Sequence, residues 1–438
     1  MKFFLPYHQN TIEVSLSRQS LASVIMPQKI SPLPDLSQAI ANALAETRDA
    51  YSFDTFFCKG DKVVIIVSDI TRYSGAPLFL PQLINRLNRT GITDNGVAIV
   101  FSLGIHRPMS FEEQKQVVGE ETAQRIRMEN HDARNYHELL FLGKTTKNTS
   151  VMINRRVAEA DKVILTGTIG YHYLAGFGGG RKSILPGVAS FESCVAAHLL
   201  VLDAEGGRHP LARTGVLQGN PLHEDTMEAA RLVPPKFLFN TILSPDHSIL
   251  NVAVGNWEEA FFQGCDFVDR HFKVFLAERA DLVVVSCGGY PNDINFIQAH
   301  KTFDYAFNAL KPGGVMILVA ACSEGIGNPD FLGWFRVQDS MEMEAELRKN
   351  FQVNGQTAYS TFMKAKKATV FFLSELPDPV VRMMSLTPVH SLEDGLAQAY
   401  QILGDNPTTY VIPYGGAVLP WVDNLPTVSC PLSVAGCP

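Results

Sequence analysis

The sequence DKVVIIVSD at residues 61–69 decides the fold, together with the three segments that follow it: PLFLPQLINRLNR at 77–89, GVAIVFSLG at 96–104 and SFEEQKQVVGEETAQRIR at 110–127. The first and third are short apolar runs typical of strands buried on both faces, whereas the second and fourth have helical periodicity. Ser110 and Glu113 predict a capping box at the start of the last helix. Strand, helix, strand and helix in succession indicate an α/β domain with a parallel sheet.

The same alternation continues further along the chain. A strand at 161–167 runs into a glycine-dense loop, GFGGGRKS at 176–183, in the position where parallel sheets bind ligands. A stretch at 264–280 is expected to be helical. Beyond it lies a second series, with strands predicted at 281–289, 313–322, 368–374 and 408–413 and helices at 295–310, 340–351 and 391–403.

The chain is therefore expected to form two mixed α/β domains with Rossmann-like sheets and an active-site cleft between them. We expect an N-terminal catalytic domain over residues 1–270 and a C-terminal, substrate-closing domain over 278–412. The tail at 413–438 is rich in Pro and Gly, so it is expected to lack regular structure and to pack on the first domain. A length of 438 residues agrees with two domains, because single cores rarely grow past about 250–300 residues.

Bulk composition excludes several classes of function. The formal net charge is −7 and the 37 basic residues are scattered, so a nucleic-acid partner is not expected. The apolar run near the N-terminus is too short for a signal peptide, and no stretch reaches the ~18 apolar residues of a membrane span. A cytoplasmic protein is predicted. The seven cysteines form no CxxC pair and are expected to be reduced core residues.

The loop at 176–183 first suggests a phosphate cradle. It departs from the Walker A pattern, because Arg181 stands where that pattern has the second glycine before the lysine. A nucleotide-dependent transferase therefore remains an alternative, as does a purely structural loop. Lys182, beside an arginine and several amide dipoles, is expected to lose its proton more easily, as a covalent nucleophile requires.

Two histidines lie at short distances in sequence from this lysine. His172 comes ten residues before Lys182, and His198 comes sixteen after it, in a helix that Ser190 is expected to cap. Neutral imidazole is a common ligand of nickel, copper, iron and zinc, although a satisfied buried histidine is the plainer interpretation of His198. One visible protein ligand is too few for a protein-built cage, so a cofactor would have to supply most of the coordination of any metal.

Further candidates follow the first two strands. His106 lies directly after the second strand and, with His172, offers an acid and a base that titrate near neutral pH, unless it is a loop histidine without a role. Asp69, Thr71 and Arg72 follow the first strand. The guanidinium of Arg72 suits a carboxylate or phosphate, with a surface turn as the alternative.

The second domain contributes one pair. Gln298 and Lys301 lie one turn apart on a predicted helix and could together hold a carboxylate and a hydroxyl, or simply be solvated.

The combination of these motifs resembles the nickel-dependent lactate racemase family. The motifs are DITR at 69–72, GIHRP at 104–108, YHYLAGFGGGRKSILPG at 171–187, the histidine at 198 and GGYPNDINFIQAHK at 288–301. The resemblance implies a racemase or epimerase that inverts C2 of a 2-hydroxy acid by hydride abstraction and return on a nickel-pincer nucleotide. It also implies that cofactor-synthesis proteins load this nucleotide.

The resemblance assigns a role to each candidate. It implies a tether between the nucleotide and Lys182, nickel coordination by His198, and alternating acid and base roles for His106 and His172. It places Asp69, Thr71, Arg72 and the loop glycines Gly178, Gly179 and Gly180 at the cofactor. Substrate binding falls to Arg72, Gln298 and Lys301.

Two departures from the family pattern concern the substrate. Ile297 precedes the glutamine where lactate-specific members have an aromatic residue, and the tryptophan expected near residues 354–356 has no clear equivalent. These differences favour a longer or more hydroxylated acid than lactate. A non-catalytic carrier of the nickel nucleotide is a further alternative, which would tolerate the loss of His106 and His172.

Overall fold

The structure is a computed structural model, and it describes residues 1–16, 20–47, 52–234 and 236–422. The chain forms two compact units. One comprises residues 28–271, and the other combines residues 1–27 with residues 272–438. Each unit is built on a six-stranded sheet flanked by helices, so the predicted α/β class is confirmed.

The sheet of the 28–271 unit has the strand order β13-β12-β9-β4-β5-β6. Its strands are β4 (Val63–Ser68), β5 (Val97–Ser102), β6 (Arg127–Asn130), β9 (Lys162–Thr168), β12 (Lys236–Leu243) and β13 (Ile249–Asn256). All pairs are parallel except β12 with β13, which form an antiparallel edge. The central strands are rich in Val and Ile residues that are almost fully buried, as the apolar runs predicted.

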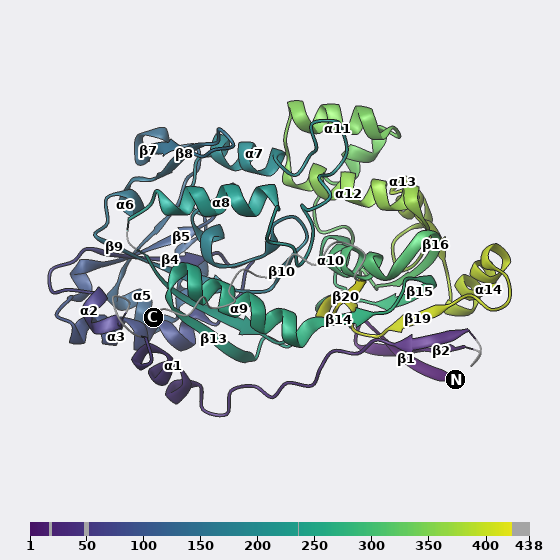
Figure 1. The fold of residues 1–438 in the computed structure, drawn as a ribbon, viewed down its shortest axis with the longest axis horizontal. Coiled ribbons are helices and arrows are strands. Elements are labelled where there is room, and N and C mark those ends of the chain that lie inside the picture. The colour runs from purple at the N-terminus through teal and green to yellow at the C-terminus, as the bar shows by residue number, and fades with distance from the viewer. Residues whose placement is uncertain (17–19, 48–51, 235, 423–438) are drawn as a thin grey trace, which may run out of the picture. The chain divides into compact units, whose positions relative to one another are not determined.

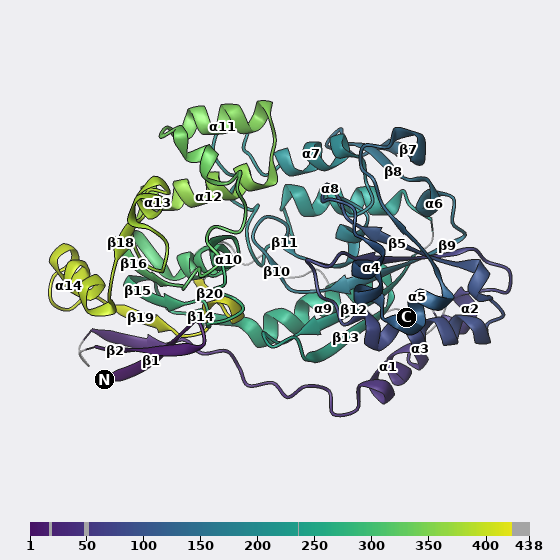
Figure 2. The same cartoon turned by 180° about the vertical axis from the view of Figure 1, so that it is seen from behind.

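Helices cover both faces of this sheet (Figures 1 and 2). The helices of this unit are α1 (Leu36–Ala45), α2 (Phe53–Phe56), α3 (Ala76–Arg89), α4 (Phe111–Val118), α5 (Glu120–Arg125), α6 (Arg155–Ala158), α7 (Phe191–Leu199), α8 (Pro221–Arg231) and α9 (Trp257–Phe272). The apolar sides of α1, α2 and α3 pack on alternate residues of β4 and β5 and form one large core. In Figure 1, α8 and α9 lie on the viewer's side of the sheet.

Two short hairpins complete this unit. The first pairs β7 (Leu139–Lys144) with β8 (Ser150–Asn154), and the second pairs β10 (Tyr171–His172) with β11 (Gly176–Phe177).

The sheet of the other unit is parallel throughout, with the order β18-β17-β16-β15-β19-β3. Its strands are β15 (Ala280–Ser286), β16 (Leu310–Val319), β17 (Thr369–Leu373), β18 (Thr387–Val389), β19 (Thr409–Ile412) and β3 (Leu21–Val24). Its helices are α10 (Phe296–Ala306), α11 (Ser340–Lys349), α12 (Val353–Lys367), α13 (Asp378–Met383) and α14 (Leu392–Leu403).

The first 27 residues were expected in the N-terminal domain, and that prediction is wrong. β3 pairs with β19 and forms the edge of the second sheet. The hairpin of β1 (Lys2–Tyr7) and β2 (Asn10–Ser15) buries Leu5 and Val14 in the core of the same unit. Strand pairing across such a separation in sequence leaves no local signal.

The described part of the C-terminal tail also differs from the prediction. β20 (Leu419–Val422) pairs in parallel with β14 (Lys273–Leu276), and both strands belong to the unit that holds residues 272–438. The described part of the tail is therefore regular over these four residues and does not belong to the 28–271 unit. Residues 423–438 lie outside the described residues.

Two predicted helices end earlier than expected. The helix at 110–127 is broken at Gly119, whose φ of +85° is left-handed, and Arg127 already begins β6. The stretch at 264–280 is helical only to Phe272, after which the chain forms β14. The capping box of Ser110 and Glu113 is confirmed.

The described cysteines carry free thiols. Cys194, Cys265, Cys287 and Cys322 are buried, whereas Cys58 is exposed, and Cys430 and Cys437 fall outside the described residues. Among the helices of the described residues, none combines the length and apolar character needed to cross a bilayer.

Candidate functional site

The candidate residues of the 28–271 unit gather at one edge of its sheet. From β4 the chain moves outward through β5 and β6, then returns to the other side of β4 with β9 and β12. The strand order therefore reverses between β4 and β9, and ligands bind outside the carboxyl ends of the strands at such a point. Asp69 follows β4, His106 follows β5, and His172 and Lys182 follow β9.

Asp69 and His106 form a hydrogen-bonded pair. The Nδ1 atom of His106 lies 2.5 Å from Oδ2 of Asp69, and the Thr71 hydroxyl donates to Oδ1 of the same carboxylate at 2.7 Å. Burial alone would raise the pKa of Asp69, but the hydrogen bonds from His106 and Thr71 and the charge of Arg72 lower it. An ionised Asp69 keeps the proton of His106 on Nδ1, so the lone pair of Nε2 is available to accept a proton.

The glycine loop is held together by Arg181. This side chain is fully buried, donates to the carbonyl of Ala175 at 2.8 Å, and lies 4.4 Å from the ring centre of Phe261 on α9. Longer hydrogen bonds reach the carbonyls of Gly178 and Gly179. The guanidinium is thus engaged by the loop's own backbone, so Arg181 has a structural role at the position where a Walker A pattern has glycine.

Two glycines are required by the shape of this loop. Gly179 has φ of +74°, and a Cβ there would lie 2.7 Å from Oδ1 of Asn240 on β12. Gly180 has φ of +52°, and its amide donates to the same Oδ1 at 2.8 Å. These constraints come from packing within the chain, and contact of Gly178, Gly179 and Gly180 with a cofactor stays a prediction.

We expect Gly180→Ala to destabilise this unit. The new Cβ would lie 2.6 Å from Cδ2 of Phe261, at a backbone angle that L-residues rarely adopt. Backbone strain and overpacking together would cost about 2–5 kcal/mol, which lowers the melting temperature by roughly 5–15 °C in a calorimetric scan. Gly178→Ala is the matched control, because the nearest atoms to its Cβ lie at 3.6 Å. An equal fall of the melting temperature in Gly180→Ala and Gly178→Ala would contradict the specific requirement for glycine at position 180.

Lys182 lies in a partly buried, cationic environment. Burial and then the charges of Arg181 and Arg72 lower the pKa of Lys182 to about 7. A substantial fraction of this amine is therefore uncharged at neutral pH, as the sequence analysis expected.

His172 has its ring fixed by the backbone. Its Nδ1 accepts from the amides of Leu174 and Ala175, at 3.2 and 3.1 Å. Burial, followed by the charges of Lys182, Arg72, His198 and Arg181, lowers the pKa of His172 well below its usual value. The neutral ring therefore carries its proton on Nε2, the opposite tautomer to that of His106.

His198 lies near the C-terminal end of α7 and is 9% exposed. Its Nδ1 donates to the carbonyl of Cys194 at 2.7 Å, which leaves Nε2 unprotonated. Burial and the charge of Lys182 lower the pKa of His198 to about 4. Histidines that bind metals through one ring nitrogen usually donate the proton of the other ring nitrogen to a carbonyl or carboxylate, and Nδ1 of His198 does so here. Ser190 caps α7 as predicted.

Electrostatic interactions connect these candidates. Lys182 and Arg72 both act on His172, Lys182 acts on His198, and Arg72 acts on Asp69, which binds His106. The structure thus brings together the candidates that the sequence analysis drew from this part of the chain. Gln298 and Lys301 lie on α10 in the other unit, where the Lys301 ammonium donates to Oε1 of Gln298 at 2.7 Å.

Two contacts of this site are not predicted from the sequence. One is the hydrogen bond between Asp69 and His106; the available signal is that both residues follow the carboxyl ends of consecutive predicted strands, β4 and β5, which pair Ser68 with Ser102. The other is the contact of Asn240 with the glycine loop, because its strand is not predicted.

Comparisons with known proteins identify relatives of this chain. The chain matches the lactate racemase N-terminal domain over residues 7–208 and the lactate racemase C-terminal domain over residues 276–419. It is 33% identical over 375 residues to a lactate racemase of Thermoanaerobacterium thermosaccharolyticum, covering 82% of this chain and 84% of that relative. It is 29% identical over 427 residues to a lactate racemase of Lactiplantibacillus plantarum, covering 95% of this chain and 98% of that relative.

A solved structure gives the same result. The lactate racemase apoprotein from Thermoanaerobacterium thermosaccharolyticum superposes with a TM-score of 0.86 at 30% identity, covering 96% of this chain and 100% of that one. The fold and the sequence matches define a racemase, an enzyme of the isomerase class. The chain belongs to the lactate racemase family.

Proposed function

We propose that this protein inverts C2 of a 2-hydroxy carboxylic acid, with a nickel-pincer nucleotide held at Lys182 and His198. The observation that carries the proposal is the group formed by Lys182, His172 and His198 beside Arg72, next to the pair of His106 and Asp69. It combines an amine that is partly uncharged at neutral pH, a neutral histidine that could bind a metal, and two histidines in opposite tautomers.

The residues present fit such a cofactor. Because Nδ1 of His198 donates to a carbonyl, Nε2 is the unprotonated ring nitrogen that could bind a metal, and the lowered pKa of Lys182 gives an amine able to form an amide-type bond. In the described ranges, no group of three or more His, Cys, Asp or Glu residues is arranged to hold a metal ion. A nickel ion at His198 would thus need further donors from a bound molecule. Asp69, Thr71, Arg72 and the amides of the glycine loop would hold the rest of the nucleotide.

When bound, this cofactor supplies a centre that takes the hydride of C2 and returns it to either face of the planar keto acid. His106 then accepts the hydroxyl proton at Nε2 when the hydroxyl of one enantiomer faces it. His172 would act on the hydroxyl of the other enantiomer through Nε2. As a base it would first have to move its resting proton from Nε2 to Nδ1, away from the amides of Leu174 and Ala175; Nε2 would then accept the hydroxyl proton, and the resulting imidazolium would act as the acid in the opposite direction. The two histidines exchange roles with the direction of the reaction, because each enantiomer presents its hydroxyl to a different side.

Arg72, Gln298 and Lys301 hold the substrate in this proposal. The hydrogen bond between Lys301 and Gln298 fixes an ammonium and an amide on the same turn of α10, which suits a carboxylate and an adjacent hydroxyl. The proposed substrate is a 2-hydroxy acid more polar than lactate, and the proposed partners are the proteins that synthesise and load the cofactor.

The proposal is tested by intact mass and nickel content after expression in a host that makes the nucleotide. The wild-type protein is expected to carry a nickel-bearing adduct and to interconvert the enantiomers of at least one 2-hydroxy acid in chiral chromatography. Lys182→Ala is expected to lose the adduct. Lys182→Arg keeps a cation but cannot form the tether, so it should lose the adduct as well.

Lys301→Ala is the matched control, because it removes a lysine assigned to the substrate and should leave the adduct in place. A wild-type protein without adduct or nickel, in a host that loads another family member, would refute the proposal. Turnover of ATP with magnesium would then be measured for the phosphate-loop alternative. The engagement of Arg181 by backbone carbonyls already disfavours that alternative.

Asp69→Asn tests the positioning of His106. The amide would present a donor to Nδ1 and favour the wrong tautomer, so kcat should fall by about 10²–10⁴-fold while KM changes little. The ¹⁵N shifts of the His106 ring should report the change of tautomer, which a merely structural role would not produce. An unchanged tautomer with full activity would remove Asp69 from this role.

A further inference from the structure

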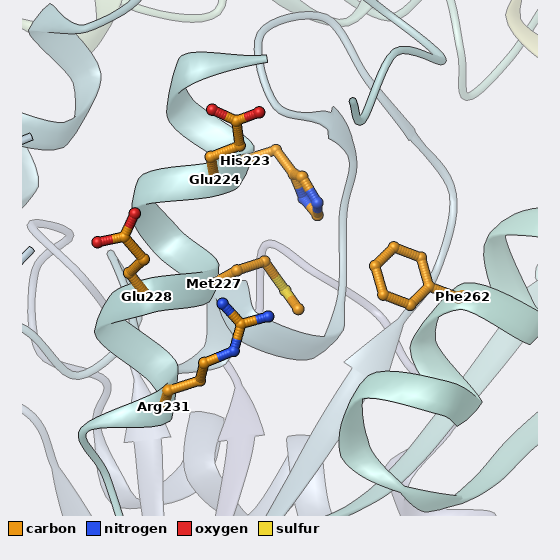
Figure 3. Close-up of a pocket in the computed structure, with 6 residues that line it drawn as sticks. All are labelled: His223, Glu224, Met227, Glu228, Arg231 and Phe262. Atoms are coloured by element: carbon orange, nitrogen blue, oxygen red, sulfur yellow. The ribbon is translucent and has the colours of Figure 1, made fainter. Parts of the chain in front are cut away.

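A hollow between α8 and α9 is not used by the proposed reaction (Figure 3). It has a volume of about 220 Å³ and is lined by His223, Glu224, Met227, Glu228, Arg231 and Phe262. All of these residues belong to the 28–271 unit. Pockets for drug-sized ligands have volumes of about 300–1,000 Å³, so this hollow suits a smaller molecule.

His223 is the unusual feature of the hollow. Its side chain is 6% exposed, and its Nδ1 atom is buried without a hydrogen-bond partner in the described part of the chain. Leaving a buried polar atom unpaired costs about 1–3 kcal/mol, so such an atom beside a hollow indicates a ligand that would satisfy it.

Two cations act on His223. Burial, followed by the charges of Arg181 and Arg231, lowers its pKa to about 2, so the ring is neutral. Arg231 binds Glu258 through Nε and Nη2, at 3.1 and 2.8 Å. Its Nη1 is not used in that pairing, and Figure 3 shows the guanidinium on the same side of α8 as the His223 ring.

The two acidic residues of the lining point elsewhere. In Figure 3 the carboxylates of Glu224 and Glu228 are directed away from the side where His223, Met227 and Phe262 face one another. Glu228 accepts from the amide and hydroxyl of Thr146, at 2.7 and 2.6 Å, and Glu224 accepts from the amide of Gly219 at 2.9 Å. The interior is therefore formed by hydrogen-bond donors, a thioether and an aromatic ring.

We propose that this hollow binds a small monocarboxylic acid. The carboxylate would accept hydrogen bonds from Nη1 of Arg231 and from Nδ1 of His223, since a neutral imidazole can carry its proton on that atom. The short aliphatic body would lie against Met227 and Phe262. This site is distinct from Arg72, Gln298 and Lys301, and it does not depend on the proposed reaction.

The site is connected to the glycine loop by stacked groups. The ring of His223 is stacked 6.2 Å from that of Phe261, and Phe261 in turn lies 4.4 Å from the guanidinium of Arg181. Arg181 precedes Lys182 in the chain. An acid bound at His223 would thus be separated from the loop by one aromatic ring.

The test is a titration of the full-length protein without cofactor, followed through the ¹H and ¹⁵N signals of the His223 ring. Sodium butyrate is expected to shift these signals to saturation. Butyramide has the same shape without the charge and should bind at least tenfold more weakly. Arg231→Gln should weaken butyrate binding at least tenfold, because it removes the charged donor.

Glu258→Gln is the matched control, because it breaks the same salt bridge but keeps the guanidinium, and it should bind butyrate at least as well as the wild type. Arg72→Ala and Lys301→Ala should leave this titration unchanged, whatever they do to catalysis. The proposal is overturned if butyrate and butyramide bind equally, if neither binds, or if binding survives Arg231→Gln and is lost in Arg72→Ala or Lys301→Ala.

Discussion

Replacement of His106 by alanine is expected to reduce the turnover of the loaded enzyme by about 10²–10⁴-fold while the nickel content stays unchanged. His106 is the one histidine of the group whose Nδ1 is bound by a buried carboxylate, which directs the lone pair of Nε2 outward. Its side chain is 45% exposed at the strand edge, so alanine removes a proton acceptor without opening a cavity in the core.

The measurement is the initial rate of interconversion by chiral chromatography, together with nickel analysis of the same sample. His137→Ala is a suitable control, because His137 is another exposed histidine of the same unit, in a short 3-10 turn. Unchanged activity in His106→Ala would remove the acid-base role. Unchanged activity in both His106→Ala and His172→Ala, with nickel bound, would favour a carrier of the cofactor over a catalyst.

Replacement of His198 by alanine is expected to release most of the nickel while the organic part of the adduct stays on Lys182. The reason is the orientation of the ring: Nδ1 donates to the carbonyl of Cys194, so Nε2 is the unprotonated nitrogen that would bind a metal. Nickel per protein should fall to a small fraction of the wild-type value, and isomerisation should fall with it. Intact mass measures the tether and elemental analysis measures the metal, so the two effects are separable.

His131→Ala provides the matched control for loss of a buried imidazole. His131 is 2% exposed, and its Nε2 bonds to the carbonyl of Ala189 in the same unit. We expect this variant to lose stability but to retain nickel. Full retention of nickel in His198→Ala would exclude His198 from the coordination sphere, and equal loss of nickel in both variants would indicate a general effect on folding.

Much of the fold could be predicted because the strands are local features. The apolar runs at 61–69, 96–104 and 161–167 correspond to β4, β5 and β9, and the helix caps at Ser110 and Ser190 leave clear signatures. These elements carry most of the candidate site, since ligands bind where such strands end. The site could therefore be outlined from residues that directly follow predicted strands.

The remainder depends on contacts between distant segments. β12 and β13 form an antiparallel edge that the strand pattern did not reveal, and β12 supplies Asn240 to the glycine loop. The bond between Asp69 and His106 joins two loops 37 residues apart. The tautomer of each histidine is likewise set by a partner in space, such as the amides that bind Nδ1 of His172. No periodicity in the sequence encodes these partners.

The position of β3 has a consequence for the order in which the protein is made. β3 ends at Val24, but its pairing partner β19 begins at Thr409, 385 residues later in the chain. At a synthesis rate of 5–20 residues per second, the N-terminal segment would wait roughly 20–80 s on the ribosome before its neighbour emerges. An isolated two-stranded hairpin is marginally stable in water. The nascent chain therefore exposes Leu5 and Val14 through most of translation, while residues 28–271 can already have folded behind them.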